Sequence, residues 1–244
     1  YLSANLGPVQ LGVFEGVLWN DIGPAGVRPF NPLEMNPVIG VNALVNGFDG
    51  RNTELLGLDG KWKLTDKTFV YGQFALTDPG RRQYAWQAGL QWFDLCRRDL
   101  HLLLEYDHAT PGAYARPDPR MSWTQYNQPL AEPLGTGFSE AVAMIDYGIL
   151  KRLWVQGEVS LAQWATGSAE AEALGSEVAQ DAASASPRRL WAELNLTWRM
   201  NQMSNMGLTP GWSTRDLQPA PTDLNSGYLH LAFHTGLFNR YYDI

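Results

Sequence analysis

The feature that most constrains this chain is a strict alternation of apolar and polar residues along segments of about ten residues. Between Gln83 and Trp92, tyrosine, tryptophan and leucine recur at alternate positions, and glutamine, alanine and glycine stand between them. Successive side chains of a β-strand point to opposite faces, so this segment is predicted to form a strand with one apolar and one polar face. A helical period does not fit the segment.

The same alternation recurs along the chain. It is clear in residues 100–107, 153–161, 190–199 and 229–237, and less regular in residues 56–64 and 70–76. Weaker candidates are Val9–Trp19, Glu140–Ile149 and Met206–Arg215; the last contains Pro210, which cannot donate a hydrogen bond to a neighbouring strand. Together these segments predict about ten strands.

The predicted connections alternate between short and long. The short turns are Thr65–Lys67, Leu95–Asp99, Leu150–Arg152 and Asn201–Asn205, and the long links are 20–51, 108–138, 166–188 and 217–226, with a brief one at 78–82. Bacterial outer-membrane barrels have short turns on one rim and longer loops on the other. The pattern therefore predicts an all-β, antiparallel transmembrane barrel in the outer membrane. An even strand count would place both chain ends on the short-turn rim.

Composition agrees with this prediction. Ten tryptophans and ten tyrosines occur among 244 residues, and these side chains concentrate where an apolar surface meets water at a membrane boundary. No stretch is apolar over the roughly 18 residues that a membrane-spanning helix requires, so contact with lipid would be made by strands. The length does not require a second domain, and residues 1–244 are interpreted as one β-barrel domain or the C-terminal portion of a larger barrel.

Charge and cysteine content exclude several functions. The net charge of −7 would repel nucleic acid, so no nucleic-acid partner is expected. Cys96 is the sole cysteine, which rules out a disulfide within the chain and a thiolate cluster for zinc or iron–sulfur. We expect no metal and no cofactor.

Several charged residues fall at the polar positions of the predicted strands and are expected to face the lumen: Lys61, Lys63, Glu105, Asp107, Glu158, Glu193 and Arg199. Two interpretations are open. The charges could line a hydrated path or a surface that faces glycan, or they could pair with one another and hold a narrow, blocked barrel together.

Candidates for catalysis are few. His108 follows Asp107 at the end of a predicted strand, but no serine motif accompanies it. His230 and His234 share a strand face but are about 13 Å apart at the rise of a strand, too far to share a metal. The chain is predicted to be non-enzymatic. The link 108–138 and the link 20–51 both carry bulky apolar residues and are expected to fold onto or into the barrel.

A candidate glycan-binding group lies in the link 108–138. It consists of Trp123, Tyr126, Asn127 and Gln128. Aromatic rings stack on the C–H faces of sugars, and amides form hydrogen bonds with hydroxyl groups.

Four stretches carry a resemblance to a known family: residues 127–135 (NQPLAEPLG), Phe30-Asn31-Pro32, residues 56–62 running into 71–74, and residues 238–243. Together they resemble Wzi-type capsule-assembly barrels of Bacteroidota and their gliding-motility relatives. Barrels of that family are longer, so the resemblance implies that this chain corresponds to the C-terminal half. It also differs from the family at Glu132, where a histidine is common, and in ending Asp243-Ile244 rather than with an aromatic residue.

The resemblance implies an outer-membrane protein that organises surface polysaccharide, or one attached to gliding or secretion machinery, with no known reaction. Its partners would be outer-membrane lipid, surface polysaccharide and other outer-membrane proteins. Three alternatives fit the same strand pattern. They are a porin-like channel, a soluble β-sandwich that binds carbohydrate, and a hydrolase that uses His108 at the rim.

Overall fold

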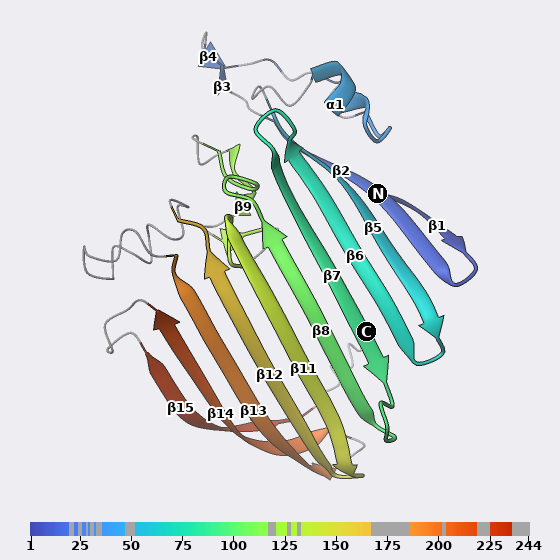
Figure 1. Ribbon diagram of the computed structural model, residues 1–244, viewed down its shortest axis with the longest axis vertical. Coiled ribbons are helices and arrows are strands. Elements are labelled where there is room, and N and C mark those ends of the chain that lie inside the picture. The colour runs from blue at the N-terminus through green and yellow to red at the C-terminus, as the bar shows by residue number, and fades with distance from the viewer. Residues whose placement is uncertain are drawn as a thin grey trace, which may run out of the picture.

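The computed structural model of this chain consists almost entirely of β-strands (Figure 1). It describes residues 1–19, 22–23, 26–27, 29, 32, 36–46, 52–116, 121–125, 128–130, 133–166, 186–201, 204–218 and 225–235. The strands of the main sheet are β1 (Leu2–Leu6), β2 (Val9–Leu18), β5 (Thr53–Thr65), β6 (Thr68–Asp78), β7 (Gln83–Phe93), β8 (Leu100–Ala109), β11 (Phe138–Leu150), β12 (Leu153–Trp164), β13 (Arg188–Asn201), β14 (Met206–Gln218) and β15 (Ser226–His234).

Three small elements lie in the connections. Two are strand pairs, β3 (Ile22–Gly23) with β4 (Gly26–Val27) and β9 (Thr124–Gln125) with β10 (Gln128–Pro129). The third is the helix α1 (Val41–Asn46). No helix within the described ranges has the length and apolar character to cross a membrane.

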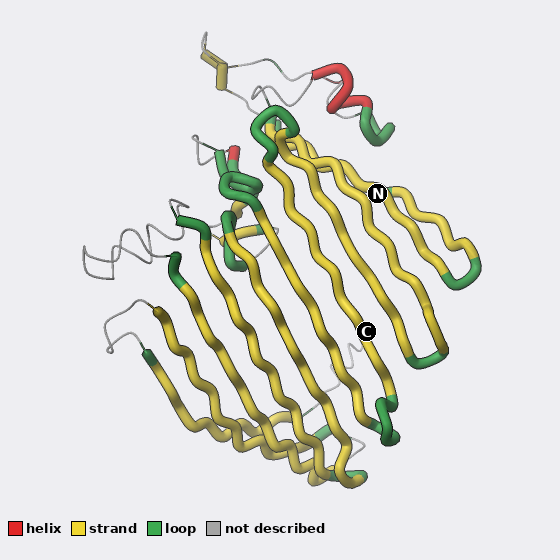
Figure 2. The backbone as a smooth tube through the Cα atoms, in the orientation of Figure 1, coloured by secondary structure: helices red, strands yellow, loops and turns green. Residues whose placement is uncertain are grey.

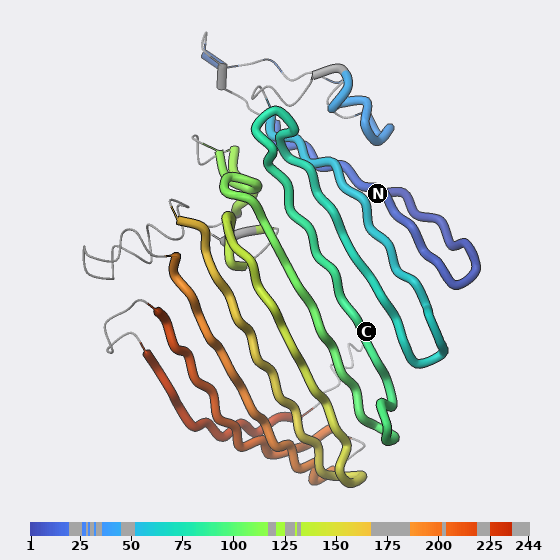
Figure 3. The backbone as a smooth tube through the Cα atoms, viewed as in Figure 1, coloured from blue at the N-terminus to red at the C-terminus, as the bar shows by residue number. Residues whose placement is uncertain are grey.

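The eleven strands form one antiparallel sheet in which each strand pairs with the next one along the chain. In Figure 3 the colour accordingly runs in sequence order from one edge of the sheet to the other. The prediction of an all-β, antiparallel fold is confirmed. The sheet is open, because β1 and β15 each have one strand neighbour in the part of the chain that the structure describes.

All ten predicted strands are present, but the prediction of an even count is wrong because β1 was not recognised. It spans only Leu2–Leu6 and pairs with half of β2 through the tight turn at Gly7, whose φ of 63° suits glycine. The chain thus enters the sheet on a strand that runs toward the short-turn rim, and β15 runs the same way. The beginning of β1 and the end of β15 therefore do not lie on one rim, contrary to what an even count implies.

The short turns close one rim, and the turn between β7 and β8 shows how. There Asp94, Cys96 and Asp99 have positive φ. The carboxylate of Asp94 accepts the Asp99 amide at 2.9 Å and pairs with Lys67 of the neighbouring hairpin at 3.2 Å. The hydrogen bond from the Asp99 amide lowers the pKa of the Asp94 carboxyl most, and the contact with Lys67 lowers it further. Cys96 is exposed in this turn.

Pro210 lies inside β14, opposite Leu231 of β15. On its other side, the pairing with β13 is interrupted between Gly211 and Leu208. The interruption follows from the missing N–H of proline, which cannot donate to a neighbouring strand. The sheet tolerates it one strand from the edge.

Figure 2 shows the strands lying side by side across the sheet. Their register divides the side chains between two faces, because cross-strand partners share a face. The apolar face carries large side chains that are exposed to a third or more, among them Leu58, Trp62, Val70, Trp92, Leu104, Ile145, Val159, Leu161, Leu194, Trp198, Leu229 and Phe233. The polar face carries charged, amide and glycine residues at many of the intervening positions. Nothing in the described part of the chain forms a second sheet over the apolar face.

Aromatic residues on the apolar face gather toward the strand ends. Trp62, Trp92 and Trp198 stand one to three residues from the short-turn ends of β5, β7 and β13. Toward the long-loop rim, Phe74 stacks on Tyr84 and Trp86 stacks on Tyr106. Leucine, isoleucine and valine fill much of the face between these two groups.

Candidate functional site

The polar face is the candidate functional surface. The seven charged residues expected to face a lumen all lie on it. Glu158 and Glu193 are cross-strand partners on this face, and Lys61 shares it with Tyr71. The remaining four residues occupy the matching alternate positions of their strands. The register thus brings them to one face but spreads them over four strands, β5, β8, β12 and β13.

These charges have mostly uncharged partners. Tyr71 donates a short hydrogen bond to Glu105, and Asn195 donates to Glu193 at 2.5 Å. The Lys61 ammonium lies 4.8 Å from the centre of the Phe69 ring, and the Arg199 guanidinium 4.5 Å from that of Trp154. Lys63 pairs with Asp66 in the adjacent turn at 2.7 Å, and this contact lowers the pKa of Asp66. Of these contacts, the one between Lys63 and Asp66 joins two opposite charges.

An ion pair that the sequence reasoning missed lies between β11 and β13. The Arg189 guanidinium reaches across β12 to the carboxylate of Glu140 at 3.2 Å, and Ser160 of β12 also donates to that carboxylate. A second group joins Asp146 to Gln156 at 2.8 Å and to His101 at 3.5 Å. The alternation of each strand already placed these residues on the polar face. Which residues meet depends on the register between strands.

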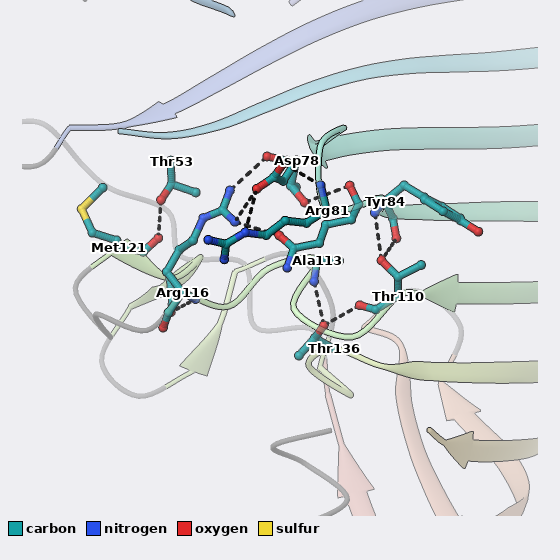
Figure 4. A network of polar contacts seen from close by, with 12 residues as sticks. Thr53, Asp78, Arg81, Tyr84, Thr110, Ala113, Arg116, Met121 and Thr136 are labelled. Carbon is teal, nitrogen blue, oxygen red and sulfur yellow. Dashed lines mark hydrogen bonds and ion pairs between the residues drawn. The ribbon is translucent and has the colours of Figure 1, made fainter. Parts of the chain in front are cut away.

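At the long-loop rim, the described parts of the loop between β8 and β11 (110–116, 121–125, 128–130 and 133–137, the β8–β11 loop) fold over the polar face, as the sequence predicted. Arg116 anchors it: the guanidinium donates to Gln83 Oε1 at 2.8 Å and to the Thr77 carbonyl at 3.0 Å, and lies 3.8 Å from Asp78 (Figure 4). Burial lowers the pKa of the Arg116 guanidinium, and the negative charge of Asp78 opposes that shift. The guanidinium remains charged in either case.

The β8–β11 loop reaches from β8 to the other half of the sheet. Its near part is held by Thr136, which donates to the Thr110 carbonyl at 2.7 Å and accepts the Ala113 amide (Figure 4). Its far part is held by Thr53 of β5, which donates to the Met121 carbonyl at 2.7 Å. The loop therefore bridges strands that are distant within the sheet.

The main hydrophobic cluster lies beneath this loop. It comprises Ala85, Ala109, Ala113, Leu134, Phe138, Ala162 and Trp164, with Tyr114 packed against it. The small alanines on β7, β8 and β12 leave room for the loop to approach the sheet. The indole N–H of Trp164 donates to the Leu134 carbonyl at 3.3 Å and ties the loop to β12.

A cavity of about 330 Å³ opens beside this cluster on the polar face. Its polar lining residues are Gln73, Gln87, Asp107 and His108, and its aromatic ones are Phe14, Trp86, Tyr114 and Phe138. The mixture of amide, carboxylate and aromatic side chains in a pocket of this volume suits a small polar ligand with hydroxyl groups.

The predicted glycan-binding group is only partly described. Trp123 is half-buried, its ring lies over Gly16 of β2, and its amide donates to the Tyr114 carbonyl at 2.9 Å. Tyr126, Asn127 and the side chain of Gln128 lie outside the described residues. The contacts of Trp123 are those of a residue that fixes the loop against the sheet.

The link 20–51, expected to fold onto or into the barrel, is described only in part. Its residues 36–46 are fastened to Glu15 of β2, which accepts the amides of Gly40 at 3.0 Å and Ala43 at 3.3 Å. Glu15 shares a face with Val13, which pairs with Leu58 of the apolar face. This part of the link therefore lies on the apolar side of the rim.

The histidines provide no complete catalytic group. His108 Nδ1 lies 2.9 Å from the hydroxyl of Ser139, a contact the sequence did not suggest, but both stand on the apolar face, with Trp86 and Gln163 as their cross-strand neighbours. Among the described residues no three histidine, cysteine or acidic side chains are placed to hold a metal ion.

Comparison of this chain with protein-family models, with curated protein sequences and with solved structures gives no match.

Proposed function

We propose that this chain forms part of the wall of a transmembrane β-barrel in the bacterial outer membrane and that it is not an enzyme. The observation that carries the proposal is the broad apolar face, whose polar residues mostly stand toward the rim of the long loops. Large side chains on it remain exposed across the sheet, for example Leu58 at 56%, Leu194 at 51% and Leu231 at 68%. A soluble protein rarely exposes an apolar patch beyond a few hundred Å², whereas lipid is a favourable environment for such a face.

Strand length supports the same proposal. Apart from β1, the strands of the main sheet have between 9 and 14 residues. A tilted strand needs about 9–11 residues to cross a bilayer. The aromatic residues toward both ends of the apolar face also match the two interfacial girdles of outer-membrane barrels.

The same face argues against a soluble β-sandwich that binds carbohydrate. Such a domain buries its apolar face against a second sheet about 10 Å away. In the described part of this chain, the hydrophobic cluster lies on the polar face instead, under the β8–β11 loop. A porin-like channel fits less well, because this loop folds over the polar face and would narrow a lumen.

We further propose that the barrel acts in organising surface polysaccharide, alone or in a larger outer-membrane complex concerned with gliding or secretion. Two features support this role. The first is the resemblance of four stretches to Wzi-type barrels. The second is the cavity beside the β8–β11 loop, where Gln73, Gln87 and Asp107 offer hydrogen-bonding groups to hydroxyls on the rim that would face outward.

Membrane fractionation of cells that produce the protein tests the proposal. The expected result is recovery with the outer membrane, release only by detergent, and strand-rich circular dichroism after extraction. Recovery in the aqueous fraction as a monomer would contradict the barrel and favour the sandwich. Large, steady conductance in planar bilayers would instead favour the porin-like channel.

The role in polysaccharide organisation needs its own test. Deletion of the gene should leave the amount of polymer made unchanged and increase the share released into the medium. A matched strain producing Gln87→Ala should retain the barrel in the outer membrane and release polymer to an intermediate degree. Unchanged retention of polymer in the deletion strain would remove this role while leaving the membrane barrel standing.

A further inference from the structure

A second cavity lies on the polar face at the opposite rim, among β12, β13, β14 and β15. Its volume is about 330 Å³, near the lower end of ligand pockets, which measure roughly 300–1,000 Å³. Its lining includes Trp154, Asn195, Arg199, His230 and His234. All five lie on the polar face by register, and none belongs to the cavity beside the β8–β11 loop.

Two glycines of β14 make room for this pocket. Side chains of Asn195 and His230 lie over Gly211 so closely that a β-carbon there would overlap them. The ring of His234 lies over Gly207, 2.7 Å from the position a β-carbon would take. The absence of side chains on the middle strand therefore allows polar groups from β13 and β15 to converge above it.

The pocket contains polar atoms without partners. Trp154 Nε1, Asn195 Oδ1 and His230 Nδ1 are buried, and no atom within the described ranges forms a hydrogen bond with them. A buried polar group that makes no hydrogen bond costs free energy, and few remain so in native proteins. Three of them around one cavity indicate a place where a bound molecule supplies the missing bonds.

The charge of the lining indicates which kind of molecule. Arg199 and the two histidines contribute to the lining, and no aspartate or glutamate does. The nearest acids by register, Asp146, Glu158 and Glu193, stand outside the lining. Two of them are engaged: Glu193 accepts the amide of Asn195, and Asp146 accepts that of Gln156. Arginine recognises carboxylates and phosphates through charge-assisted hydrogen bonds. The cavity therefore favours an anion.

The same lining also suits hydroxyl groups. Because the amide nitrogen of Asn195 donates to Glu193, its oxygen is the atom left to the cavity, and it can accept from a hydroxyl. Thr197 and Thr209, whose hydroxyls lie 2.9 Å apart, add two more groups of this kind. We propose that this pocket binds a hydroxylated organic anion the size of one acidic monosaccharide, such as a uronate or a sugar phosphate. The proposal depends only on the pocket and not on the placement of the sheet in a membrane.

Isothermal titration calorimetry of the full chain with four probes tests the inference. Glucuronate and glucose 6-phosphate carry the two anionic groups, glucose is the neutral match, and inorganic phosphate carries charge without the sugar. We expect one of the two acidic sugars to bind at least tenfold more tightly than glucose and phosphate, and the better of the two identifies the anion. No saturation by any probe at about 10 mM, above the millimolar range of weak sites, would overturn the inference.

Variants locate the binding. Arg199→Gln should weaken the acidic sugar at least tenfold, and Arg199→Lys should restore part of the loss. Trp154→Phe keeps a ring beneath Arg199 but removes the unpartnered N–H, and should weaken binding about 2- to 10-fold, the effect of one neutral hydrogen bond. Arg188→Gln is the matched control at the far end of the same strand on the apolar face. Equal affinity in Arg199→Gln and Arg188→Gln, with both variants folded by circular dichroism, would refute the site.

Discussion

Gly89 decides where Tyr71 lies on the polar face. Tyr71 projects from β6, and its ring passes directly over Gly89 of β7 before the hydroxyl reaches Glu105 of β8. A single bulky side chain at the middle position would block that path. Phe14 lies over Gly57 in the same way. A glycine on one strand thus leaves room for a side chain from the neighbouring strand to lie across it.

Gly89→Ala is expected to destabilise the protein by about 1–3 kcal/mol, because the new methyl group displaces the Tyr71 ring and breaks its bond to Glu105. Gly60→Ala is the matched control. A β-carbon at Gly60 makes ordinary contact with Leu11 at 3.4 Å, so this variant should be neutral or slightly more stable. Thermal unfolding followed by circular dichroism compares the two, and equal midpoints would show that Tyr71 adapts without loss.

Arg116 holds the β8–β11 loop against the sheet as a buried cation that donates hydrogen bonds to several acceptors. Arg116→Ala should lower the free energy of unfolding by about 1–3 kcal/mol, since Gln83 and the Thr77 carbonyl lose a charged donor. The loop should also become accessible to trypsin or chymotrypsin in limited proteolysis. Arg98→Ala, at a side chain 92% exposed in a turn, should change stability by less than about 0.5 kcal/mol. A loop equally protected in both variants would refute the anchoring role.

Strand β13 shows what an element contributes as a unit. Leu190, Leu194, Leu196 and Trp198 lie on its apolar face, and Arg189, Glu193 and Asn195 among others lie on its polar face. The strand alone cannot bury either set. Its apolar side chains need an apolar environment over the whole sheet, and its polar ones need the neighbours that the register provides.

Leu194→Arg tests that requirement for the apolar face. Midway along β13, a charge facing lipid should destabilise the membrane-inserted state by about 2–4 kcal/mol, and the variant should assemble poorly in liposomes. Gln163→Arg, on the same face but near the long-loop end of β12, should lose only about 0–1 kcal/mol. Folding yields in liposomes measure both. A similar yield for the two variants would mean that the face does not meet the bilayer core.

In the whole molecule, the direction of the edge strands limits how the sheet can close. Both β1 and β15 run toward the short-turn rim, and they occupy opposite edges of the sheet in Figure 1. If they paired with each other, the seam would be parallel. An all-antiparallel barrel, which has an even strand number, needs an odd number of further strands between them.

Cysteine cross-linking in the membrane tests this. In a Cys96→Ser background, Ala4→Cys combined with Leu229→Cys or Leu231→Cys should give no disulfide within one chain, because a disulfide requires Cα atoms within about 7 Å. Ala4→Cys with Leu11→Cys is the positive control, since these residues are cross-strand partners. A disulfide between the edges would show that the eleven strands close on themselves.

The sequence by itself determined the strands and their two faces. Alternation is a local property, so the segments 83–92 and 190–199 could be assigned to strands and their charged residues to one face from the order of residues alone. The short strand β1 escaped this reasoning because five residues give too little pattern to distinguish from a loop. That omission changed the strand count from even to odd and misplaced one end of the chain.

Only the tertiary structure decided which side chains meet. The pair of Glu140 with Arg189, the path of Tyr71 over Gly89 and the group around Gly211 all join residues on different strands, and their partners depend on the register that each turn and bulge sets. The anchoring of the β8–β11 loop by Arg116 also joins segments far apart in the chain. Alternation fixes the face on which a side chain lies; the neighbour it contacts depends on how the strands are aligned.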